Sequence, residues 1–174
     1  PLTGLPNVAG QDGLALADEV PVDLRGQPLP LDPWGADLEG VVRTPDGHYW
    51  MGDEYRPSLY EFDARGRLVN RYIPIGAGAA GAGGTEALPA VYNQRRVNRG
   101  FEAVAYADGK IYAFLQSPLD NPDVSNDASS KASRNVRIVA FDLATRRVAG
   151  EYLYVLEGGS SDKIGDAVAV GKGR

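Results

Sequence analysis

Apolar positions between residues 37 and 74 fall in short runs separated by turn residues, which is the pattern of successive β-strands. The first two runs flank Asp46 and Gly47, a dipeptide that favours a tight hairpin turn because glycine adopts positive φ without a steric penalty. The sequence therefore predicts an antiparallel meander of four strands, at residues 39–43, 48–53, 58–63 and 67–73.

A second meander is predicted after a long connection, residues 75–97, that is rich in glycine and alanine. Its strands are expected at residues 101–106, 110–116, 135–142 and 148–156, with a polar insertion at residues 117–134. The first of these strands carries apolar side chains on both faces: Phe101 and Ala103 lie on one face, and Val104 and Tyr106 lie on the other. Such a strand suits a sheet that is covered on both sides by neighbours.

An acidic residue recurs at the start of each unit: Glu39, Glu102 and Asp166 follow one another at intervals of 63 and 64 residues. A near-constant interval indicates structural repeats, and repeats of about four strands build a β-propeller, which closes with roughly 4–8 blades. We therefore expect an all-β, β-propeller-like fragment of about two and a half four-stranded antiparallel blades. A lead-in segment at residues 1–36, with one modest strand at 13–17, precedes units at 37–74 and 100–156 and an incomplete unit at 164–174.

The expected units are too few to close a propeller, and unpaired edge strands invite association. The sequence thus indicates that the fragment is completed by the rest of a longer chain or by other subunits.

The composition is that of a globular protein, with 174 residues of which 43% are hydrophobic and 24% charged. A formal net charge of −5 gives no electrostatic reason to bind nucleic acid or an anionic membrane. No apolar run reaches the roughly 20 residues that cross a bilayer, so no membrane span is expected. Because the chain has no cysteine, thiol catalysis and thiolate metal sites are excluded.

Carboxylates supply the candidate chemistry. In a radial array, Glu39, Glu102 and Asp166 would converge on the central axis, and converging carboxylates are unfavourable unless a cation or an arginine compensates them. Oxygen donors of this kind favour Ca²⁺, with Mg²⁺ as the second choice. The predicted catalytic residues are Glu39, Glu102, Asp53 and Glu54, and the predicted metal ligands are Glu39, Glu102 and Asp166, together with Asp120 and Asp123 of an acidic loop.

The same carboxylates have a structural alternative, because in propellers such residues often cap strand ends or pair with arginine. Three cationic residues, Arg56, Arg99 and Lys163, are expected to hold an anionic group of the substrate. The single histidine, His48, directly follows a turn and is interpreted as a solvated strand start rather than as part of a catalytic triad.

These motifs resemble, over residues 37–174, the phytase-like family assigned esterase-like activity. The resemblance rests on Asp37-x-Glu39-Gly40, on the Asp-Gly turn followed by Trp50 and Asp53-Glu54, and on the run from Asn98 to Glu102. It implies a calcium-favouring propeller that hydrolyses phosphate or carboxylate esters of small molecules. It also implies export, to an extracellular, periplasmic or cell-envelope location. Family members continue after the third hairpin with a strand ending in Glu-Arg, which this sequence lacks.

Two other functions remain open at this point. A gluconolactonase-type propeller enzyme also uses a Glu-Gly strand start and a divalent ion. A non-catalytic propeller of the cell envelope, acting as a scaffold or binding module, would need neither ion nor substrate.

Overall fold

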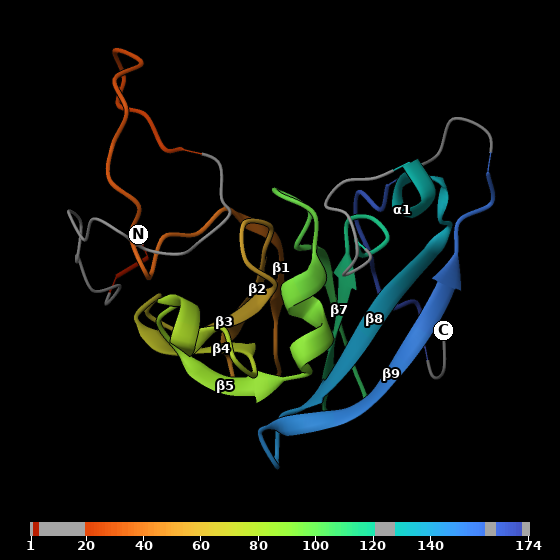
Figure 1. Cartoon of the computed structure of the whole chain (residues 1–174). Helices are drawn as coiled ribbons and strands as arrows, with labels where there is room; N and C mark the ends of the chain where they lie inside the picture. The colour runs from red at the N-terminus through yellow and green to blue at the C-terminus, as the bar shows by residue number, and fades with distance from the viewer. Residues whose placement is uncertain (1, 4–19, 121–127, 159–162, 172–174) are drawn as a thin grey trace.

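Two β-sheets dominate the computed structural model, which describes residues 2–3, 20–120, 128–158 and 163–171 (Figure 1). The first sheet has the strand order β1-β2-β3-β4-β5 and is antiparallel except that β5 pairs parallel with β4. The second sheet, β6-β7-β8-β9, is antiparallel throughout. The strands are β1 (Leu38–Arg43), β2 (Tyr49–Asp53), β3 (Ser58–Phe62), β4 (Leu68–Pro74), β5 (Thr85–Leu88), β6 (Phe101–Ala107), β7 (Lys110–Leu115), β8 (Asn135–Asp142) and β9 (Arg147–Val155).

The all-β prediction is confirmed, and each of the eight expected meander strands forms with its ends within one residue of the expected positions. The predicted turn between the first two strands is present, with Gly47 at a φ of 90° and its N–H donating to the Thr44 carbonyl at 2.9 Å. Turn chemistry and apolar runs were therefore sufficient to locate both meanders.

The connection at residues 75–97 is more ordered than predicted. It contains β5 and two 3-10 helices, η1 (Gly78–Ala80) and η2 (Ala90–Gln94), so the first sheet has five strands rather than four. The Thr-Glu-Ala-Leu sequence of β5 lacks a strand pattern of its own, and its pairing with β4 arises only from the fold. The polar insertion likewise carries one short helix, α1 (Ala128–Ala132).

The third unit forms no strand over residues 163–171, the part of it that the structure describes. A strand needs a hydrogen-bonding neighbour, and among the described residues the start of this unit makes a single backbone bond, from the Ile164 N–H to the Gln116 carbonyl at 2.8 Å. The strand suggested at residues 13–17 lies outside the described residues.

Aromatic side chains join the two sheets in a shared core. Trp50 and Tyr72 of the first sheet stack with ring centroids 5.7 Å apart, and Phe141 of the second sheet lies 4.6 Å from the Tyr72 ring. Rings at these separations attract one another beyond the effect of their burial. The two sheets therefore pack as adjacent layers rather than as separate units.

The inner strands of the two sheets approach so closely that only glycine fits between them. A Cβ atom added at Gly52 would lie 2.8 Å from the Phe101 carbonyl oxygen, and one added at Gly100 would lie 2.4 Å from the Asp53 carbonyl oxygen. Gly40 meets the backbone of β6 in the same way, with Val104 N at 2.9 Å. These contacts bring β1 and β2 against β6.

A buried carboxylate ties the outer parts of the sheets together. Glu61 on β3 is 1% exposed and pairs with His48 at 2.8 Å and with Arg146, from the turn between β8 and β9, at 2.9 Å. The Arg146 guanidinium also lies over the Trp50 ring, 5.3 Å from its centroid. His48 is thus a partner of Glu61 and only 28% exposed, rather than a fully solvated strand start.

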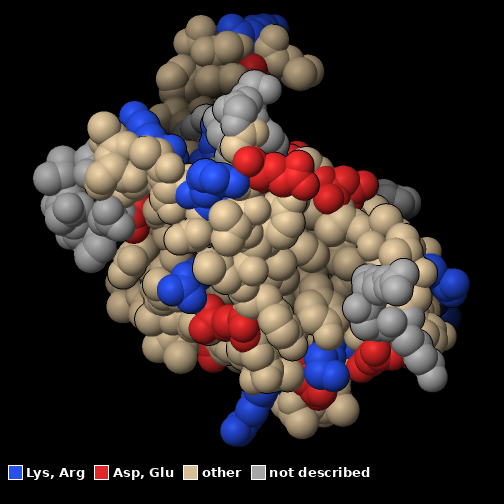
Figure 2. Space-filling model, turned by 90° about the vertical axis from the view of Figure 1, so that its right-hand side faces the viewer, with Lys and Arg blue, Asp and Glu red and all other residues tan. Residues whose placement is uncertain are grey.

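The side of the molecule where β8 and β9 lie carries scattered charged groups among a mostly uncharged surface (Figure 2). On these strands Arg137 of β8 and Glu151 of β9 form a partly exposed ion pair at 3.5 Å. Four consecutive residues of β9 are exposed apolar side chains: Tyr152, Leu153, Tyr154 and Val155. An exposed edge strand of this composition favours association with another chain or segment.

We predict that Arg146→Gln lowers the free energy of unfolding by about 1–3 kcal/mol, because it removes a charged hydrogen-bond donor from a buried carboxylate. Urea unfolding followed by tryptophan fluorescence measures the change. The neighbouring substitution Arg147→Gln is the control, since Arg147 is exposed, and it should shift the free energy by less than about 0.5 kcal/mol. Equal effects of the two substitutions would contradict the role of Arg146 between the sheets.

The close approach of the sheets predicts that Gly100→Ala is destabilising by about 1–3 kcal/mol, since the added methyl group must displace backbone. Gly165→Ala is the matched control, because no heavy atom lies within 4 Å of a Cβ at that position. Both variants can be compared by thermal and urea unfolding. An unchanged Gly100→Ala protein would show that the sheets separate more easily than their spacing indicates.

Candidate carboxylate site

A chain of backbone hydrogen bonds connects the inner ends of successive units. The Glu54 N–H donates to the Asp37 carbonyl at 2.9 Å, and the Gly100 N–H donates to the Glu54 carbonyl at 2.7 Å. The second unit repeats the first bond, with the Gln116 N–H donating to the Gly100 carbonyl at 2.8 Å, and the bond from Ile164 to Gln116 continues the series. The ends of β2 and β7 are therefore held beside the starts of β1 and β6.

Each of the two inner strands has a register shift at or directly after its acidic residue. In β1 the register shifts between Glu39 and Val41, where Gly40 has a φ of 55°. In β6 the register shifts between Phe101 and Ala103, on either side of Glu102. Bulges redirect side chains and are common beside functional sites. The repeat of 63 residues thus reproduces a local backbone distortion as well as a carboxylate.

Three carboxylates converge at this junction. Asp37, Glu39 and Glu54 each place one oxygen so that the three oxygens lie within 4.8 Å of one another. Glu102 joins the group through Gln116, whose side-chain amide donates to Glu54 and, at 2.6 Å, to Glu102. We call Asp37, Glu39, Glu54 and Glu102 the carboxylate cluster.

Electrostatics in the carboxylate cluster disfavour full ionisation. Burial raises the pKa of Glu54 to about 7, and the Glu102 charge and the hydrogen bond with Asp37 act in the same direction. Burial also raises the pKa of Glu39, and the charges of Glu102 and Asp37 add to that shift. A bound cation would remove this repulsion.

Arginine side chains compensate only part of the negative charge of the carboxylate cluster. Arg99 lies 3.6 Å from Glu54, but among the described residues Glu39 and Glu102 form no ion pair with Lys, Arg or His. The structural alternative, in which each carboxylate has its own arginine, instead describes Asp53. That side chain is fully buried, pairs with Arg71 at 2.9 Å and accepts the Ser58 hydroxyl at 2.8 Å.

The cluster fits a hard divalent cation. All of its side chains offer carboxylate oxygens, the ligands that Ca²⁺ and Mg²⁺ prefer. The Gln116 side-chain oxygen is buried and has no hydrogen-bond partner among the described residues, so a neutral oxygen donor is available beside the carboxylates. Ca²⁺ accepts an irregular set of oxygen ligands more readily than Mg²⁺, which demands a near-ideal octahedron.

The sequence located Glu39, Glu54 and Glu102 but did not assign Asp37 to the site. The spacing Asp37-x-Glu39 could have identified Asp37, since side chains two residues apart in an extended chain point to the same side. Asp166 is not one of the three converging carboxylates; it is exposed and accepts the Ala167 N–H at 2.7 Å. Asp120 is half-buried and is also outside the three-carboxylate group. Asp123 lies outside the described residues.

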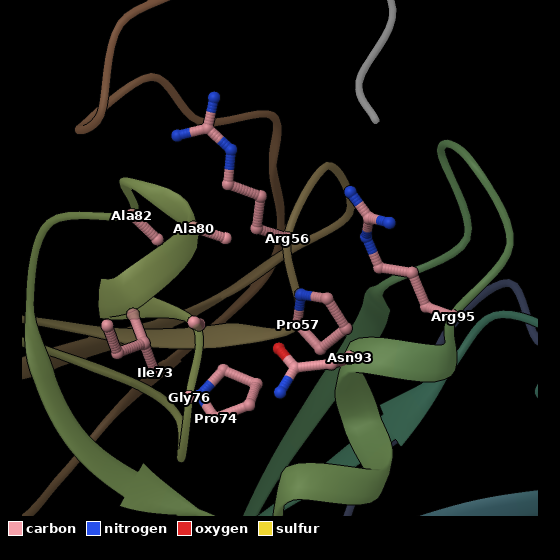
Figure 3. A pocket seen from close by; sticks show the side chains of 10 residues that line it. Arg56, Pro57, Ile73, Pro74, Gly76, Ala80, Ala82, Asn93 and Arg95 are labelled. Carbon is pink, nitrogen blue, oxygen red and sulfur yellow. The ribbon is translucent and has the colours of Figure 1, made fainter. Parts of the chain in front are cut away.

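The three predicted anion-binding residues occupy two places. Arg56 lines a hollow of about 300 Å³ whose walls include Ile73, Pro74 and Arg95 (Figure 3). Its guanidinium donates to the Asp32 carbonyl at 2.8 Å. Arg99 and Lys163 line a different hollow, so the structure brings these two together and leaves Arg56 apart.

Comparison with known proteins identifies relatives at the level of sequence. The family model named Phytase-like, described as esterase-like activity of phytase, matches residues 3–174. A protein of Arthroderma benhamiae, named an uncharacterized secreted protein, is 29% identical over 142 residues, which are 69% of this chain and 27% of that protein. The chain thus spans about a quarter of the length of this curated relative.

Among solved structures, apo AztD from Citrobacter koseri aligns over 74% of this chain and 25% of its own, with 16% identity and a TM-score of 0.36. In the part of the chain that the structure describes, no helix has the length and apolar character to cross a membrane.

Glu54 makes the stability of the metal-free chain depend on pH. Its pKa is about 7 when folded, against 4.5 for an ordinary glutamate, so between these values the folded chain holds a proton that the unfolded chain has released. The free energy of unfolding should therefore decrease as the pH rises from about 5 to about 8. We expect the Tm in chelator to fall over this range and Glu54→Gln to remove part of the fall.

At each pH the difference in Tm between the wild type and the variant is compared, because the contributions of the other titrating groups then cancel. Glu157→Gln, which changes an exposed carboxylate, is the control and should follow the wild type. A Glu54→Gln profile parallel to that of the wild type would contradict the shifted pKa.

Proposed function

The chain belongs to the Phytase-like family, and on that premise we propose that its carboxylate cluster binds Ca²⁺ and supports hydrolysis of phosphate or carboxylate esters of small molecules. The observation that carries the proposal is the convergence of Asp37, Glu39 and Glu54 without a matching set of arginines. Three carboxylates held this closely, with Glu102 joined to them through Gln116, are explained by a cation better than by a purely structural role.

Asp37 and Glu39 are assigned to hold the cation, and Glu102 takes part through Gln116, which fixes the orientation of both Glu102 and Glu54. When bound, a divalent cation supplies Lewis-acid polarisation of an ester or phosphoryl oxygen and lowers the pKa of water. Hydrogen bonds that orient the ligands of a metal ion, such as those from Gln116, commonly affect both metal affinity and activity.

Glu54 is the best candidate for a general base. Burial is the largest cause of its raised pKa in the metal-free chain, and burial makes a carboxylate a stronger base toward an attacking water. We assign Arg99, which lies 3.6 Å from Glu54, to hold an anionic group of the substrate beside that carboxylate. Asp53, which was predicted to be catalytic, is better assigned as a positioning residue because Arg71 and Ser58 bind its carboxylate in the interior.

An extracellular or cell-envelope location is proposed for the protein, in keeping with the secreted relative from Arthroderma benhamiae. Calcium is abundant in such compartments, and the weak extracellular calcium modules have dissociation constants of about 10⁻⁴–10⁻³ M. A site with only three or four carboxylates could therefore be filled there.

A hydrolysis panel tests the proposal, using an aryl phosphate, phytate, an aryl ester and a lactone as substrates, each with calcium and with chelator. We expect calcium-dependent turnover of an ester. Glu54→Gln should reduce kcat about 100-fold, because it removes the base while keeping the shape of the side chain. Glu39→Gln and Glu102→Gln should mainly weaken activation by calcium.

Glu157→Gln is the matched control and should leave all rates unchanged. Turnover of the lactone alone would favour the gluconolactonase-type alternative. If none of Glu39→Gln, Glu54→Gln and Glu102→Gln changes the rates at any calcium concentration, the catalytic assignment is overturned and a scaffold or binding role is left.

A further inference from the structure

A second site candidate is linked to the carboxylate cluster by Arg99, which lines it and pairs with Glu54. It is a hollow of about 330 Å³ whose lining includes four cationic side chains and two hydroxyl groups. We call it the basic hollow, and the residues that matter to its chemistry are Arg96, Arg99, Lys131, Lys163, Ser117 and Ser133.

The cations of the basic hollow come from three separate parts of the chain. Arg96 and Arg99 precede β6, Lys131 belongs to α1, and Lys163 lies at the start of the third unit. Only Arg99 pairs with a described carboxylate, Glu54, at 3.6 Å. Four like charges around one small volume repel each other, and in a chain of net charge −5 this arrangement is not a consequence of general basicity.

Two residues that line the basic hollow have buried side-chain donors without acceptors. The Nε and Nη2 atoms of Arg96 are buried and have no hydrogen-bond partner among the described residues. The Ser117 side chain is 4% exposed, and its hydroxyl likewise has no partner there. Buried polar groups are nearly always hydrogen-bonded in folded proteins, so donors left in this state mark a place where a ligand oxygen would bind.

We propose that the basic hollow binds a tetrahedral oxyanion, either free phosphate or the phosphate group of a monoester. A guanidinium group offers paired donors to two oxygens, while ammonium and hydroxyl groups act as single donors from other directions. This combination matches a doubly charged group with several oxygens better than a planar carboxylate. The small size of the hollow and the net negative charge argue against a nucleic acid or a membrane surface.

The inference goes beyond the proposed hydrolysis, because the basic hollow lies outside the carboxylate cluster and needs neither a cation nor turnover to bind an anion. Only Arg99 is shared between the two places. Binding measured in chelator therefore tests the basic hollow separately from the enzymatic proposal.

The test is a calorimetric titration of inorganic phosphate into the chain, in chelator at constant ionic strength and neutral pH. We expect saturable binding to the wild type. The double variant Lys131→Gln/Lys163→Gln, which changes two exposed side chains, should bind about 100-fold more weakly, since each of the two lost charged contacts is worth about a factor of ten. Ser117→Ala should also weaken binding, without any change in charge.

Lys110→Gln/Arg147→Gln is the matched control, because it removes the same charge at the opposite end of β7 and β8. It should bind phosphate like the wild type. No saturable binding to the wild type, or equal affinities of the two double variants, would overturn the proposal. A parallel titration with phenyl phosphate separates the sources: binding of both ligands supports a site open to esters, whereas binding of inorganic phosphate alone supports a site for the free anion.

Discussion

Backbone-to-backbone contact between the inner strands is the constraint on which the rest of the structure depends. Gly52 and Gly100 allow the first sheet to lie directly against the start of β6, and the Gly100 N–H then bonds to the Glu54 carbonyl at 2.7 Å. The Ile164 N–H repeats this bond with the Gln116 carbonyl at 2.8 Å, so the junction is a structural module rather than an accident of one contact. Carboxylates meet there because the strand ends that carry them are held together.

Two adjacent acidic residues, Asp53 and Glu54, have different electrostatic environments. Asp53 is neutralised by Arg71, whose guanidinium also donates to Ser58 and to the Pro33 carbonyl, so this pair satisfies its polar groups inside the protein. Glu54, the next residue, instead faces other carboxylates and has a pKa raised to about 7. A saturated pair of the first kind fixes the fold, whereas an unsaturated group of the second kind is available to a ligand.

The sequence was sufficient for the strands and for three of the four residues of the carboxylate cluster, for identifiable physical reasons. Apolar runs and Asp-Gly turns are local signals, so both meanders could be located, and the interval between Glu39 and Glu102 revealed their shared position. The distinction between Asp53 and Glu54 could not be made, because it depends on Arg71 from a later strand. The pairing of β5 and the grouping of Arg99 with Lys163 likewise arise from contacts between segments far apart in the chain.

The bulges at Glu39 and Glu102 also limit how this family can change in length. Because strand side chains alternate between faces, inserting or deleting one residue beside either bulge would turn its glutamate away from the junction. The outer turn at residues 107–110 carries no such restriction, since it joins strand ends that are already fixed by the sheet and nothing lies within 4 Å of a Cβ at Gly109. An engineered insertion at this outer turn therefore leaves the arrangement of acids intact, whereas one beside a bulge dismantles it.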